Sequence, residues 1–296
     1  MIEFDFETWA AEAIVALRSG IHLRRPSNYQ SLFKYISLNS DVSWDYLHKT
    51  LHEAELVGEA ASSLNDPFEL NPYVFDDLQS SIIAEAVRHT DSAFLDDREP
   101  TPLSEVFPDP EPFRLQARLY LQQVLDRYRI IAFCERVDSS LLWSHYANSY
   151  QGACLHFLAK GFRWHSHYTL GHVSYSKYRP AYPLSLALAL SSKPGQPVEV
   201  PVNASPLRRA ESNKILFFTK ADDWAYEAEI RLVYDQEQHP FVRFKTDSLV
   251  SIITGPRFTD ENRQRLDRIL KGSLYENITI RKAQLSKTTF TVEIGE

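Results

Sequence analysis

The chain has 296 residues, of which 44% are hydrophobic and 24% are charged. This composition is ordinary for a folded globular protein, and the length allows a substantial core. The net charge of -7 excludes a global basic field that would attract nucleic acid, although a local basic groove stays possible.

Two cysteines, Cys134 and Cys154, are too few for a cysteine metal quartet or a disulfide framework. Both lie in apolar runs, so we expect buried free thiols and a reducing, cytoplasmic setting. The start of the chain is acidic where a signal peptide would be basic, and the longest apolar run, around 184–190, is too short to cross a bilayer. No membrane association is therefore expected.

The first half is predicted to hold helices, short extended segments and turns. Helical periodicity and turn residues predict a helix over 6–19, a connector over 21–31, a strand over 32–36, a helix capped by Asp41, an extended piece over 54–57, a turn at 65–67, and helices over 74–90 and 111–128. The acidic, proline-bearing segment 91–112 is expected to be a mobile loop or lid.

The second half is predicted to be rich in strands. The expected elements are strands over 129–134, 152–157, 172–176, 227–234, 241–244, 249–254, 278–283 and 290–294, with helices capped near 138–139 and over 206–219 and 259–271. Because the strands follow the first helices, the order favours an α+β fold. We expect an N-terminal helix and connector over 1–31 and a single domain over 32–296.

The stretch Trp224–Tyr234 contains the most informative charge pattern. From Glu227 onward it alternates charged and apolar residues, and side chains of a strand alternate between its two faces. Glu227, Glu229 and Arg231 would then share one face. Carboxylates held together beside an arginine separate the pKa values of acid and base groups. The simpler alternative is an edge strand with a solvated, charged face.

Three histidines, His165, His167 and His172, fall within eight residues of one another. They lack an adjacent carboxylate or cysteine at ligand spacing, so no metal site is expected there.

Three groups of motifs carry a resemblance to a known family. They are Phe33-Lys34-Tyr35-Ile36-Ser37 with Leu64–Glu69, Cys134–Arg136 with Leu142–Ala147 and Gly152, and Lys220 with Trp224–Arg231 and Ile253–Arg257. The Trp-Ser-His-Tyr and Trp-x-Tyr-Glu-x-Glu-x-Arg segments are long and specific. The chain resembles the bacterial family described as domain of unknown function 2971, over roughly residues 32–294.

The layout is also similar, more distantly, to ADP-ribosyltransferases. That resemblance implies a mixed or antiparallel, split sheet flanked by helices, NAD as a substrate, and a setting in bacterial defence or a toxin system. The roles it implies are catalysis by Glu227, Glu229 and His145 and NAD binding by Lys34, Tyr35, Trp143, Tyr146, Arg231, Asn65 and Asp66. The chain departs from that family because it has no Ser-Thr-Ser element and because His145 and Tyr146 are predicted on a helix.

The implied chemistry suits these residue types. A carboxylate beside the ribose stabilises the positive charge that develops when nicotinamide leaves, and a second can orient the acceptor. Arg231 could hold a pyrophosphate, and aromatic rings could stack on the bases. Each residue also has a structural reading: Trp143 in the core, Arg231 paired with Glu229, His145 in a structural hydrogen bond, and Asn65 and Asp66 as turn formers.

Two other functions stay open. A Mg²⁺-dependent nuclease could use Asp66, Glu69, Glu227 and Glu229, because clustered carboxylates bind hard cations. A non-enzymatic ligand-binding or interaction domain is the second. The partners expected are a small nucleotide and an acceptor that is either protein or nucleic acid, and the sequence indicates no oligomeric state.

Overall fold

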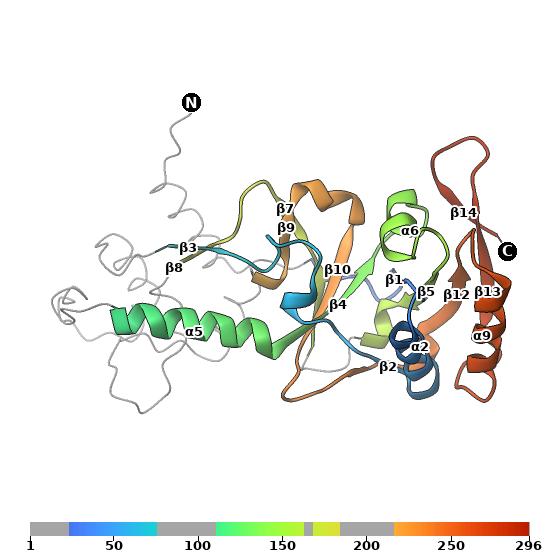
Figure 1. Cartoon of the computed structure of the whole chain (residues 1–296), viewed down its shortest axis with the longest axis horizontal. Coiled ribbons are helices and arrows are strands. Elements are labelled where there is room, and N and C mark those ends of the chain that lie inside the picture. The colour runs from blue at the N-terminus through green and yellow to red at the C-terminus, as the bar shows by residue number, and fades with distance from the viewer. Residues whose placement is uncertain (1–23, 76–110, 163–167, 184–215, 296) are drawn as a thin grey trace. The chain divides into compact units, whose positions relative to one another are not determined.

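The computed structural model describes residues 24–75, 111–162, 168–183 and 216–295 (Figure 1). These residues form two compact units. The smaller unit gathers the described parts of 61–127 and 174–222, and the larger unit gathers those of 23–60, 128–173 and 223–296. The expected helix over 6–19 and most of the expected loop over 91–112 lie outside the described residues. The predicted domain limits stay predictions.

The larger unit is built on an 8-stranded sheet with the order β14-β13-β12-β5-β1-β4-β10-β6. Neighbours are antiparallel except β12 and β13, which are parallel, so the sheet is mixed. Its strands are β1 (Ser31–Ile36), β4 (Tyr128–Cys134), β5 (Ala153–Leu158), β6 (Tyr168–His172), β10 (Glu229–Asp235), β12 (Leu249–Thr254), β13 (Thr279–Leu285) and β14 (Val292–Ile294).

Helices cover both faces of this sheet. On one face, α2 (Asp41–Glu53) and α9 (Asp260–Leu270) contribute apolar residues such as Leu47 and Leu266 to the main core. On the other face, α6 (Ser140–Tyr146) places Leu142 and Trp143 in a second core. Figure 1 shows α6 on the opposite side of the strands from α2 and α9. The two cores arise because successive side chains of each strand point to opposite faces.

The helices begin at residues whose side chains accept backbone hydrogen bonds. Ser139, one of the two caps predicted at 138–139, caps α6, and Thr259, where a helix was predicted to begin, caps α9. The cap of α2 is Ser40, whose hydroxyl accepts from the Ser43 amide, and the prediction that Asp41 is the cap was wrong. Asp41 instead occupies the first turn, where a carboxylate is favourable beside the positive end of the helix dipole.

Strand β1 is joined very unequally to its two neighbours. All six of its residues are in register with β5, whereas its register with β4 consists of the Phe33–Cys134 pair alone. Beyond that pair, Ile130 of β4 forms a bridge with Glu59, which follows the short strand β2 (Glu55–Leu56). The sheet is therefore split between β1 and β4.

The smaller unit contains α5 (Glu111–Arg127) and two short parallel strand pairs. These pairs are β3 (Tyr73–Phe75) with β8 (Ala181–Pro183), and β7 (Ser174–Ser176) with β9 (Thr219–Ala221). The helix predicted over 74–90 is wrong at its start, because Tyr-Val-Phe suits a strand and pairs with β8. The helix predicted to end at residue 219 is likewise wrong at its end, where β9 begins; residues 206–215 lie outside the described part.

The α+β class and the mixed sheet flanked by helices confirm the predicted fold class. Among the helices that the structure describes, none combines the length and the apolar character needed to cross a membrane.

Candidate functional site

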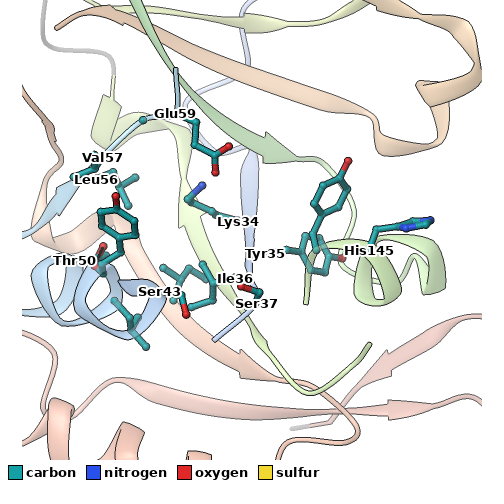
Figure 2. Close-up of a pocket in the computed structure, with 15 residues that line it drawn as sticks. Lys34, Tyr35, Ile36, Ser37, Ser43, Thr50, Leu56, Val57, Glu59 and His145 are labelled. Carbon is teal, nitrogen blue, oxygen red and sulfur yellow. Dashed lines mark hydrogen bonds between the residues drawn. The ribbon is translucent and has the colours of Figure 1, made fainter. Parts of the chain in front are cut away.

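A cavity of about 300 Å³ lies in the larger unit where the sheet splits. Its walls come from β1, α2, the segment that follows β2, and the end of α6 (Figure 2). The residues that line it are Lys34, Tyr35, Ile36, Ser37, Ser43, Tyr46, Leu47, Thr50, Leu56, Val57, Gly58, Glu59, His145, Tyr146 and Leu155. The volume is at the small end of the range for ligand sites, and the mixture of apolar walls with a few polar groups is typical of them.

Lys34 and Glu59 are a basic and an acidic residue in this lining. The Lys34 ammonium and the Glu59 carboxylate point toward one another in Figure 2. Lys34 is half-buried and Glu59 is exposed. Burial lowers the pKa of Lys34, and the negative charge of Glu59 opposes that shift without cancelling it. Glu59 was missed by the sequence analysis, because its place beside Lys34 depends on its long-range bridge to Ile130.

Tyr35 joins the cavity to the second core. Its hydroxyl donates a hydrogen bond to the Arg136 carbonyl, and its ring meets the Trp143 ring edge-on at 5.2 Å. Burial raises the pKa of the Tyr35 hydroxyl, so it stays protonated. Trp143 is fully buried and donates from its indole nitrogen to the Val137 carbonyl. Trp143 thus packs against the Tyr35 ring and is not part of the cavity lining.

The end of α6 brings two further predicted residues, His145 and Tyr146, to the lining. His145 is exposed, and in Figure 2 its ring points away from Lys34. A tight turn follows, in which Asn148, Ser149 and Tyr150 all have positive φ angles of 45°, 52° and 72°. Non-glycine residues rarely adopt this conformation, so the surroundings must hold it.

Two glycines allow that turn to pack closely. A side-chain carbon at Gly152 would lie 2.2 Å from the Ile36 carbonyl oxygen, and one at Gly255 would lie 2.1 Å from the Tyr150 carbonyl oxygen. The Gly152 amide donates to the Ala147 carbonyl. The turn therefore fixes the end of α6 against the end of β1, where the cavity lies.

Glu227 does not line the cavity itself but is hydrogen-bonded to Tyr146, which does. The Tyr146 hydroxyl donates a hydrogen bond of 2.5 Å to Glu227 Oε1, and Glu227 is buried. The prediction that Glu227 belongs to the strand was wrong: it ends a 3₁₀ helix (Asp222–Glu227), and Ala228 has a φ of 45° before β10 begins at Glu229. This backbone reversal breaks the alternation of faces and directs Glu227 toward α6.

Glu229 and Arg231 share a face of β10, as predicted, and form a closed ion pair. The Arg231 guanidinium donates from Nε and from NH2 to the two carboxylate oxygens of Glu229, at 2.7 and 3.0 Å. Arg231 is 1% exposed and Glu229 is 4% exposed. Burial lowers the pKa of Arg231, while the bidentate contact favours its charged form. Neither residue lines the cavity.

The position of β10 corrects the alternative of a solvated edge strand. It lies between β4 and β6, and all seven of its residues are buried. The charged residues at its start are consequently held inside the protein, which requires partners for them.

Asn65 and Asp66 belong to the smaller unit, whereas the cavity is formed within the larger unit. The Asp66 carboxylate accepts a hydrogen bond from the Phe68 amide, which is typical of a turn former. Glu69, in the same turn, is buried with Lys220 at 3.6 Å. In the described part of the chain, no group of three His, Cys, Asp or Glu residues is arranged to hold a metal ion.

Comparison with known protein families gives a match over part of the chain. Residues 142–232, about a third of the chain, match the family described as Protein of unknown function (DUF2971). This match confirms the resemblance to that family, and the matched segment runs from α6 to β10, so it contains Tyr146, Glu227, Glu229 and Arg231. No curated protein and no solved structure matches the chain.

Proposed function

We propose that the cavity in the split sheet binds a nucleotide, with NAD as the substrate, and that the protein transfers ADP-ribose to an acceptor. The observation that carries the proposal is the convergence of Lys34, Tyr35, His145 and Tyr146 on one cavity, with Glu227 bound to Tyr146. These residues come from three separate segments of the chain. At about 300 Å³, the cavity has room for one end of a dinucleotide, with the remainder extending outward.

Glu227 is the preferred catalytic carboxylate in this proposal. Loss of nicotinamide leaves positive charge on the ribose, and a carboxylate held in a low-dielectric site stabilises such charge strongly. Glu227 is buried next to the lining through Tyr146, whereas the Glu229 oxygens both accept from Arg231. Tyr35 and Tyr146 supply aromatic surface for the nicotinamide or the ribose, and Lys34 and His145 supply polar contacts.

A second candidate function is ligand binding without catalysis. The closed contact between Glu229 and Arg231 favours it, because these two charges are already satisfied by one another and serve the structure. In that case the cavity would hold the nucleotide as a signal. The nuclease alternative has less support, since Glu69 is paired with Lys220 and Glu229 with Arg231.

The test is a calorimetric titration with NAD, with and without Mg²⁺, together with an assay of nicotinamide release. Wild type is expected to bind NAD and release nicotinamide, and Glu227→Gln is expected to lose about 100- to 1000-fold in rate while it still binds. Glu293→Gln, at an exposed position on β14, is the matched control and should behave as wild type. Binding without release would support the second candidate, and absence of binding would refute both.

The setting of the reaction is also part of the proposal. The two cysteines of the chain are free and buried, which fits a reducing cytoplasm. We place the reaction there, in a bacterial defence or toxin system, with a protein or a nucleic acid as the acceptor. Labelled NAD added to a cell extract, followed by separate protease and nuclease digestion, would show which class carries the label.

A further inference from the structure

We propose that Lys34 is a nucleophile, and that its amine forms an imine with the aldehyde of a small hydroxylated molecule held in the cavity. This activity does not rest on NAD binding. It requires only the cavity, the Lys34 amine and the Glu59 carboxylate, and it extends what the sequence indicated for Lys34, which was a binding contact.

Lys34 combines partial burial with the absence of an ion pair in the described part of the chain, whereas lysines such as Lys177 and Lys282 are exposed and three other lysines are paired with carboxylates. Lys49 pairs with Glu53 and Glu55, Lys160 pairs with Asp247, and Lys220 pairs with Glu69. Within the ranges that the structure describes, no residue lies at ion-pair or hydrogen-bonding distance from the Lys34 ammonium. The amine is half-buried and borders a cavity, so it is available to a ligand and is not held in a structural contact.

Burial makes this amine more reactive than an exposed one. An amine attacks a carbonyl only in its neutral form, and desolvation lowers the pKa of Lys34, which enlarges the neutral fraction. Several titratable groups surround it: the cavity lining adds Glu59, Tyr46, Tyr35, Tyr146 and His145, and Cys134, Cys154 and Glu229 act on it through space. The opposing influences of Glu59 and Glu229 are smaller than that of burial.

Glu59 is placed to move the protons of the reaction. The neutral Lys34 nitrogen attacks the carbonyl carbon, a C–N bond forms, and the carbonyl oxygen takes up a proton to give a carbinolamine. Loss of the hydroxyl as water, with one proton from nitrogen, then leaves a C=N bond, so that aldehyde and amine become imine and water. Glu59, which faces the amine, can give and accept these protons and can neutralise a protonated imine.

The lining indicates the class of aldehyde. Hydroxyl groups of Ser37, Ser43 and Thr50 line the cavity together with apolar side chains such as Leu47 and Leu56. Their hydrogens are donated to protein acceptors, so their oxygens can accept hydrogen bonds from a ligand that carries hydroxyl groups. The expected ligand is a short hydroxyaldehyde or an open-chain sugar.

The test uses glycolaldehyde with cyanoborohydride, which reduces an imine to a stable amine. The full chain is treated with a limiting amount of the aldehyde near neutral pH, and proteolytic peptides are mapped by mass spectrometry. Lys34 is expected to be modified about tenfold or more faster than Lys282, an exposed lysine on β13, because a bound aldehyde lies beside the amine. Equal rates at Lys34 and Lys282 would overturn the proposal, and this comparison needs no variant to fold.

Variants separate the nucleophile from its proton donor. Lys34→Arg keeps a positive charge but should abolish the adduct in that peptide and leave the Lys282 adduct unchanged. Glu59→Gln should slow modification of Lys34 at alkaline pH, where the amine is neutral in both proteins and only the proton transfer differs, whereas Glu293→Gln should not. An unchanged rate in Glu59→Gln would refute the role of Glu59 and leave Lys34 as a nucleophile without a carboxylate partner.

Discussion

The larger unit contains two pairs of oppositely charged residues. One pair is Glu229 and Arg231, and the other is Lys34 and Glu59. Glu229 and Arg231 are fully buried, bidentate and surrounded by paired strands. Lys34 and Glu59 face one another across a cavity at the point where strand pairing stops. A buried charge needs a partner to be tolerated, so the first pair serves the fold. The second pair is not closed, and its charges are available to a ligand.

The largest expected effect is on the closed pair. Glu229→Gln removes the carboxylate charge that the buried Arg231 guanidinium contacts through two hydrogen bonds, and we expect a loss of about 3–5 kcal/mol in unfolding free energy. Urea denaturation measures it, with Glu293→Gln as the control. The double variant Glu229→Leu/Arg231→Met should recover much of the loss, because no unpaired charge stays buried. An unchanged midpoint in Glu229→Gln would mean that the pair is not structural.

The contact between Tyr146 and Glu227 connects the two regions. Tyr146→Phe removes the donor to a buried carboxylate, and we expect a loss of about 1.5–3 kcal/mol, as for hydrogen bonds to charged groups. Thermal melts of this variant are compared with those of Tyr29→Phe, at an exposed tyrosine. If both variants have the same melting temperature, the hydrogen bond from Tyr146 to Glu227 does not stabilise the protein, and the inferred link between the cavity and β10 is wrong.

The turn after α6 should be sensitive to added volume. Gly152→Ala places a carbon against the Ile36 carbonyl, so we expect a loss of about 1–3 kcal/mol, typical of overpacking. Gly295→Ala is the matched control, since the carbon it adds would lie 3.2 Å from the Lys282 carbonyl oxygen. Equal stability of the two variants would show that the end of α6 can move away from β1.

The smallest effect is expected at Lys34 and depends on pH. Because the pKa of Lys34 is lowered in the folded protein, the unfolded chain binds more protons than the folded one between the folded and the ordinary pKa values. Unfolding free energy of the wild type should therefore rise with pH across that window, relative to Lys34→Met. Denaturation of both proteins from neutral to alkaline pH measures this. A difference that falls as pH rises would reverse the sign of the pKa shift.

Much of the fold could be predicted because its signals are local. The apolar runs of β1, β4 and β12 and the Thr259 cap of α9 are readable from a few consecutive residues. The expected faces of Glu229 and Arg231 were also confirmed, since both lie inside β10. The cap of α2 was misplaced by one residue, because serine and aspartate are both good caps.

The site was less predictable because it depends on exceptions and on distant pairing. Ala228 has a left-handed backbone conformation, which the sequence does not indicate because the residue is neither glycine nor asparagine. The alternation of charged and apolar residues therefore could not predict the position of Glu227. Glu59 becomes part of the cavity through its bridge to Ile130, which is 71 residues away in sequence (130 minus 59). His145 and Tyr146 were identified as candidates, and the structure brings both to the cavity.

The single registered pair between β1 and β4 has a mechanical consequence. Beyond Phe33 and Cys134, β1 and β4 share no registered pair, and Ile130 of β4 is hydrogen-bonded to the main chain of Glu59 instead. On either side of this break, β1 pairs with β5 and β4 pairs with β10 through continuous ladders of main-chain hydrogen bonds. Separation of the sheet at this break would cost the Phe33–Cys134 pair and the two main-chain hydrogen bonds between Glu59 and Ile130, and it would leave both ladders intact. The sheet therefore has fewer main-chain bonds to resist deformation beside the cavity than it has at either neighbouring joint.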